Sequence, residues 1–212
     1  MGTILEKILI IPAILIAFTV QGYSKARMAD KLGDKTPRFQ GRLSLSPFNH
    51  IDLVGFIMIL VIGFGWTKPV ETNPNAYKRG HKDAIKVTLV SLFSTLIVAF
   101  IASFIYVLFL KFGSVLTIST YKIIVLILSN VILINVSLFI FNLLPLPGLA
   151  GFEIWKNFWP KSFYKSSDYM YQYQMFIMLG IILLGQYILG YPVSKIVSLF
   201  IKIALLVLGI FI

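Results

Sequence analysis

VTLVSLFSTLIVAFIASFIYVLFL, residues 87–110, decides the class of this protein, because it carries no charged residue over a length that can cross a membrane. An α-helix rises about 1.5 Å per residue, so roughly 20 apolar residues span the ~30 Å of hydrocarbon in a bilayer. Residues 123–144 form a second uncharged, apolar stretch of similar length. Both segments predict membrane-spanning helices.

Four further segments are long and apolar enough, or nearly so, to be membrane helices: residues 4–20, 51–66, 169–189 and 196–212. Lys202 lies within the last of them, and we expect its side chain to snorkel to the interface or to face the helix bundle. The sequence therefore predicts an all-α polytopic integral membrane protein with about six membrane helices. We treat residues 1–212 as a single membrane domain.

The composition agrees with a membrane location and bears on the partners. Hydrophobic residues make up 58% of the chain and charged residues 13%, whereas soluble domains have roughly 45–50% and about 25%. The net charge is +11, but the basic residues are spread over short segments between apolar stretches. This distribution favours an anionic lipid bilayer as the partner and argues against nucleic acid.

The basic residues also bear on topology, since positively charged segments tend to lie in the cytoplasm. Residues 23–50 and residues 67–83 are both rich in lysine and arginine. A simple crossing by residues 51–66 would place these two segments on opposite sides of the membrane. Either part of this region dips back into the membrane or the rule fails, so the sequence leaves the topology open.

Three segments interrupt the apolar stretches. Residues 42–46 alternate polar and apolar side chains, which predicts a short β-strand or hairpin. Residues 67–83 contain two X-Pro pairs typical of a loop, and residues 142–151 contain two prolines and two glycines, which favours a turn. The chain has no cysteine, which excludes disulfides and thiolate metal sites.

Residues 32–52, LGDKTPRFQGRLSLSPFNHID, are similar to the motif LGDxTxxxxGRLTLNPxxHxD of the site-2 proteases, a family of intramembrane zinc proteases. Residues 64–74, with FGWTKPV followed by Asn-Pro, and residues 142–151, NLLPLPGLAG, resemble two further motifs of that family in the same order. The resemblance implies a site-2 protease-like core in a bacterial plasma membrane. The motif residues to which it assigns a structural role are Gly33, Asp34, Gly41, Arg42, Pro47, His50, Asp52, Gly65, Lys68, Pro69, Asn142, Pro145, Pro147 and Gly151.

The resemblance also maps the H-E-x-x-H zinc-binding helix of the family onto QGYSK, residues 21–25. Histidines at i and i+4 share one helix face and bind Zn²⁺ together, while the glutamate takes a proton from the metal-bound water. Here Gln21 and Lys25 occupy the two histidine positions, and Gly22 occupies the glutamate position. Ala150 replaces the aspartate ligand of the family's L-D-G turn.

An amide, an ammonium group and two side chains without donor atoms are not a zinc ligand set. We therefore expect no metal or other cofactor in this chain, although zinc serves the active relatives. The pattern predicts a pseudoprotease, a non-catalytic homologue that binds or regulates membrane-protein clients, or an active paralogue, without cleaving them.

Two alternatives stay open at this point. One is an active intramembrane metalloendopeptidase with unconventional ligands or another chemistry, for which His50, Asp52, His81 and Ser24 are the available side chains. The other is a transport or channel role, suggested by Lys202 and by the proline–glycine break at residues 145–151. For His50 and Asp52 we favour a capping or hydrogen-bonded pair that opens the next helix, because aspartate is preferred at a helix start.

Overall fold

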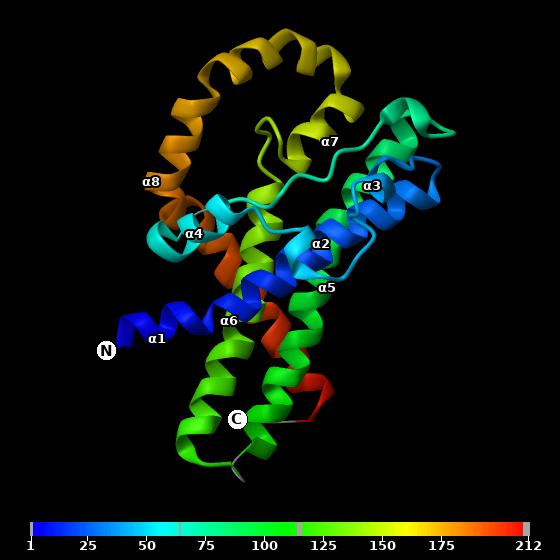
Figure 1. Ribbon diagram of the computed structural model, residues 1–212. Helices are drawn as coiled ribbons and strands as arrows, with labels where there is room; N and C mark the ends of the chain where they lie inside the picture. The colour runs from blue at the N-terminus through cyan, green and yellow to red at the C-terminus, as the bar shows by residue number, and fades with distance from the viewer. Residues whose placement is uncertain (1, 64, 114–115, 210–212) are drawn as a thin grey trace.

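The computed structural model describes residues 2–63, 65–113 and 116–209, and over these ranges the fold is helical (Figure 1). Four helical segments are long and apolar enough to cross a membrane: Ile4–Lys31, His81–Phe112, Ile118–Asn142 and Leu189–Val207. They correspond to α1 (Gly2–Leu9) with α2 (Ile11–Lys31), to α5 (His81–Phe112), to α6 (Ile118–Asn142) and to the end of α8 (Pro160–Val207). The shorter helices are α3 (Thr36–Phe39), η1 (Pro47–Asn49), α4 (Leu53–Ile62), η2 (Pro74–Ala76) and α7 (Ala150–Phe158).

The prediction of six membrane helices is wrong in the described part of the chain, and residues 51–66 are the first reason. Their helix, α4, has only 10 residues, about 15 Å of helix and half of what a bilayer requires. Asp52 caps its start by accepting a hydrogen bond from the Gly55 amide at 2.8 Å. Gly63, with φ of 77°, ends it in the left-handed region that glycine tolerates best.

Residues 169–189 are the second reason. They are helical, but they belong to α8, a single helix of 48 residues whose membrane-crossing part is Leu189–Val207. The stretch is interrupted by polar groups, since it begins Tyr-Met-Tyr-Gln-Tyr-Gln, and in Figure 1 the first half of α8 arches away from the other long helices. The predicted segment 196–212 overlaps the observed one, and residues 210–212 lie outside the described residues.

The predicted strand at residues 42–46 is also wrong, since no strand forms in the described ranges. The Arg42 guanidinium donates to the carbonyl oxygens of Asn49 and, at 3.0 Å, of Pro69, so the chain folds back on itself here. The Ser46 amide donates to the Ser44 hydroxyl at 3.0 Å, which is a local turn contact. The only β-type pairing described is an isolated antiparallel bridge between Ile51 and Thr67.

Small residues hold the long helices together. Ala99 and Ala102 of α5 are buried against Val131, Ile132 and Val136 of α6 in one core cluster. Small side chains allow helix backbones to approach closely in a membrane, where packing rather than water exclusion drives association. In Figure 1, α5 and α6 lie side by side, and α2 crosses them obliquely, in contact with both.

Candidate functional site

The four positions that the resemblance assigns to the zinc site converge on one cavity of about 110 Å³. Gln21, Gly22 and Lys25 reach it from α2, and Ala150, the first residue of α7, reaches it from the opposite wall. The remaining lining residues are Phe18, Thr67, Lys68, Pro69, Val70, Thr88, Ser91, Asn142, Gly148 and Glu153. The convergence of residues so far apart in the sequence makes this cavity the candidate site.

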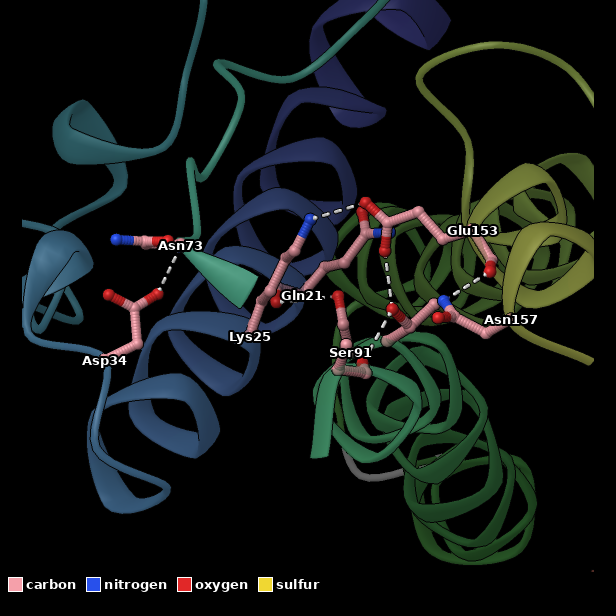
Figure 2. A network of polar contacts seen from close by, with 9 residues as sticks. Gln21, Lys25, Asp34, Asn73, Ser91, Glu153 and Asn157 are labelled. Carbon is pink, nitrogen blue, oxygen red and sulfur yellow. Dashed lines mark hydrogen bonds and ion pairs between the residues drawn. The ribbon is translucent and has the colours of Figure 1, made fainter. Parts of the chain in front are cut away.

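An ion pair crosses the cavity from α2 to α7 (Figure 2). The Lys25 ammonium lies 3.5 Å from Oε1 of Glu153. The other carboxylate oxygen, Oε2, accepts a hydrogen bond from the Thr88 hydroxyl of α5 at 2.5 Å. The carboxylate of Glu153 therefore joins three helices at the point where the family resemblance places the metal ligands.

Glu153 and Thr88 are the site residues that sequence reasoning missed. A signal for Glu153 was present, because it is the only acidic residue between Asp83 and Asp168. It also lies three residues after Ala150, close to one helical turn. Thr88 gave no such signal, since its hydroxyl stands in a long apolar stretch and only the fold brings it to the carboxylate.

Two further hydrogen bonds hold the walls of the cavity. The Ser91 hydroxyl of α5 donates to the backbone carbonyl of Gln21 at 3.3 Å, which ties α5 to α2 (Figure 2). The Asn157 side-chain amide donates to the backbone carbonyl of Glu153 at 2.7 Å, and its oxygen contacts Nδ1 of His81 at 2.8 Å. His81 is thus engaged outside the cavity.

His50 occupies the space beside Gly22. Its side chain is 1% exposed, and its Nε2 lies 2.7 Å from the carbonyl oxygen of Ser44, which makes Nε2 the protonated nitrogen. Nδ1 has no hydrogen-bond partner among the described residues. A Cβ atom on Gly22 would overlap this imidazole, so the ring fills the volume where a side chain at position 22 would begin.

Burial disfavours the imidazolium form and lowers the pKa of His50 below its ordinary value. The Ser44 carbonyl, which accepts a hydrogen bond from the ring, opposes this effect, while the positive charge of Arg42 adds to it. At neutral pH His50 is therefore a neutral, buried group that packs against Gly22.

Two of the motif residues after α2, Lys68 and Pro69, line the cavity. Arg42 holds the carbonyl of Pro69, and the Lys68 amide donates to the carbonyl of His50 at 3.0 Å, so Lys68 and Pro69 are held at the cavity edge. Asp34 is fully buried and accepts from the Thr36 and Asn73 amides at 2.9 Å and 2.7 Å.

The remaining motif residues shape turns and contacts around the site. Gly33 and Gly41 have φ of 115° and 70°, and Pro47 begins η1. Gly65 allows the chain to approach the Gly55 backbone.

The other motif residues lie where α6 ends and α7 begins. At the end of α6 the Asn142 side-chain amide donates to the Leu138 carbonyl at 2.8 Å, and Pro145 and Pro147 lie in the predicted turn. Gly151 lets α7 start against the carbonyls of Leu143 and Leu144.

The side chains present do not fit a zinc ion. Zinc in proteins is held by histidine nitrogen, cysteine sulfur or carboxylate oxygen, usually in a four-coordinate arrangement. The cavity offers instead an amide at Gln21, an ammonium at Lys25 and one carboxylate, Glu153, which is already paired with Lys25. In residues 2–63, 65–113 and 116–209, no group of three or more His, Cys, Asp or Glu side chains is placed to hold a metal ion.

No protein-family model and no solved structure matches the chain. Among curated proteins, the chain is similar to one from Bacillus subtilis (strain 168) that is named "Putative zinc metalloprotease YwhC". The two are 35% identical over 178 residues, which is 83% of this chain and 81% of that protein. With most of both chains aligned at this identity, the chain described here belongs to the metalloprotease family that includes YwhC.

Proposed function

We propose that this chain is a pseudoprotease of the site-2 type that binds a segment of a membrane-protein client, in a bacterial plasma membrane, and does not cleave it. The observation that carries the proposal is the Lys25–Glu153 ion pair in the cavity where the family resemblance places the zinc ligands. A lysine ammonium repels a dication, and this one already has a carboxylate partner.

The chemistry of the cavity supports binding rather than hydrolysis. The Lys25 ammonium has three N–H donors and one carboxylate partner at 3.5 Å, so it can also donate to a backbone carbonyl or a carboxylate of a client. Hydrolysis of a peptide bond also requires an activated water. Gly22, at the position of the family's general base, has no side chain to take the proton.

The client segment would enter as extended chain. Thr67, Lys68 and Pro69 follow one another along the cavity edge in non-helical conformation. The Lys68 amide already donates to the His50 carbonyl. Pro69 has no N–H, and its carbonyl accepts from Arg42. Thr67 is therefore the residue of the three whose main chain can hydrogen-bond to an extended segment laid beside it, as peptides do at exposed sheet edges. In this proposal, residues 67–69 take the role of pairing with the client. Residues 42–46, from which a strand was expected, do not form one.

The decisive experiment is elemental analysis of the purified protein in lipid nanodiscs, combined with incubation with a single-span membrane substrate. We expect no stoichiometric zinc and no cleavage. The triple variant Gln21→His/Lys25→His/Ala150→Asp is expected to gain about one zinc per chain, because it places two imidazoles at i and i+4 on one face of α2 and a carboxylate at the start of α7, on the same cavity.

The matched control is Gln21→His/Lys68→His/Ala150→Asp, which adds the same three groups but puts one histidine on the cavity edge outside α2. It lacks the i, i+4 histidine pair on the helix and is expected to gain no stoichiometric zinc. Zinc that is bound at one equivalent by the unaltered chain and lost in Gln21→Ala would overturn the proposal. So would zinc-dependent cleavage of the substrate by the unaltered chain.

A further inference from the structure

Lys202 lies within the last membrane segment of α8, Leu189–Val207, five residues before its end. Its neighbour Phe200 packs edge-on against Phe100 of α5, with ring centroids 5.3 Å apart, and the Ser103 hydroxyl lies 3.4 Å from the Phe200 carbonyl. Ser103 is nine residues before Phe112, where α5 ends, which is about 14 Å along the helix. Phe200 is therefore well inside the membrane, and Lys202 is only about 3 Å further along α8.

The side chain of Lys202 points away from the bundle. Phe200 packs against the α5–α6 core and Ala204 is buried, whereas Lys202 is exposed. Leu199 and Leu206, three residues before Lys202 and four after it, are exposed on the same face. The outward face of this membrane helix thus carries Lys202 between Leu199 and Leu206, with the exposed Ser198 and Lys195 one and two turns before it. Of the two orientations expected for Lys202, the one that faces the bundle is not observed.

No acidic side chain in the described ranges forms an ion pair with that lysine. All eight acidic residues of the chain lie in those ranges. Within α8 the only acidic residue is Asp168, 34 residues earlier, and in α5 it is Asp83, twenty residues before Ser103. α6, the other helix packed against the end of α8, contains no acidic residue.

We propose that the outward face of α8 around Lys202 docks a transmembrane helix of another protein that carries a carboxylate at the depth of Lys202. Ionised side chains within membrane segments are costly, and they pair with one another or face water. A second copy of this chain does not satisfy the requirement, because it would present the same lysine. Leu199 and Leu206 supply the apolar contacts on either side of the charge.

This surface is separate from the cavity, so it can be tested on its own. The protein is reconstituted in lipid vesicles with a fluorescent label, and energy transfer is measured to single-span leucine peptides labelled with the matching dye. One peptide has a glutamate at mid-span, one a glutamine and one only leucine. We expect the glutamate peptide to associate about tenfold more tightly than the leucine peptide.

Charge reversal makes the test specific. Lys202→Leu is expected to remove the preference for glutamate, and Lys202→Glu is expected to transfer it to a peptide with a mid-span lysine. The control variant is Lys122→Leu in α6, an exposed lysine near the start of that helix, which is expected to change nothing. Equal association of all three peptides, or a glutamate preference that survives in Lys202→Leu, would overturn the proposal, whatever the outcome of the zinc and cleavage assays.

Discussion

At the scale of single residues, Lys25 changes the electrostatics of the cavity. Its one positive charge is tethered to α2 and is matched by one carboxylate, Glu153. A zinc ion would bring two charges and polarise a bound water, whereas an ammonium only donates hydrogen bonds. The Lys25 ammonium can therefore donate hydrogen bonds to a group bound in the cavity, but it cannot act as a Lewis acid on a bound water.

Gly22 provides the sharpest prediction at this scale. Gly22→Ala places a methyl group into the His50 ring, so the ring or α2 must shift. Overpacking of this kind typically destabilises by about 1–3 kcal/mol. We expect a lower thermal unfolding temperature in detergent or nanodiscs.

The control for this prediction is Gly180→Ala. Gly180 is also helical, but an added Cβ there would meet nothing within 4 Å. Alanine is the better helix former, so the control variant should be unchanged or slightly more stable. Equal behaviour of the two variants would show that His50 does not restrict position 22.

The candidate site could be predicted only in part from the sequence, and its residues show why. Gln21, Gly22, Lys25 and Ala150 were found because motif spacing fixes their positions, and the structure brings all four to one cavity. The Glu153 partner was missed, because an ion pair between residues 128 positions apart depends on how α7 packs and leaves no periodic trace.

At the scale of elements, the Glu153 carboxylate links α7 to α2 through Lys25 and to α5 through Thr88. We expect a double-mutant cycle with Lys25→Met and Glu153→Gln to give a favourable coupling below about 1 kcal/mol, because partly exposed ion pairs contribute little. Here the side chains are 22% and 43% exposed. The measurement is thermal or denaturant unfolding of the four proteins.

The reference pair for this cycle is Asp83 and Lys86, which lie 3.5 Å apart within α5 and link no separate helices. Lys25→Met, unlike Lys86→Met, is expected to loosen α7 and so raise proteolytic cleavage in residues 143–149. A coupling of zero with unchanged proteolysis would mean that the contact does not hold α7.

The sequence predicted well the membrane helices whose uncharged apolar stretch is by itself long enough to span a bilayer. α5 and α6 were expected from uncharged stretches too long for any other apolar element, and both form helices long and apolar enough to cross a membrane. Residues 51–66 have similar apolarity, yet Asp52 and Gly63 set the ends of a helix too short to cross. Residues 42–46 have the period of a strand, but the Arg42 hydrogen bonds to distant carbonyls override that local pattern.

At the scale of the whole molecule, the short α4 removes the conflict in the charge distribution. Because α4 is too short to cross, the chain between the candidate spans of α2 and α5, residues 32–80, stays on one side of the membrane, and the basic residues within 23–50 and 67–83 gather at that side. In Figure 1, the segment between α2 and α5 and the segment around α7 lie toward the same end of the bundle, and the end of α5 and the start of α6 lie at the other. The positive-inside rule then places the basic end in the cytoplasm.

Cysteine labelling can test this topology directly, since the chain has no cysteine of its own. Thr117→Cys lies in the α5–α6 connection and Asn75→Cys in η2, and both positions are exposed. With a membrane-impermeant maleimide on intact cells, we expect labelling of Thr117→Cys alone. Asn75→Cys should react only after the cells are opened, and the reverse pattern would invert the topology.

The contact between Gly22 and His50 also has an evolutionary consequence. As long as the imidazole occupies that volume, no substitution at position 22 alone can introduce a longer side chain without displacing the ring. Position 22 and the placement of the ring at position 50 are therefore expected to vary together among relatives. A side chain longer than glycine at position 22 should be accompanied by an imidazole, or a backbone around it, that has moved aside.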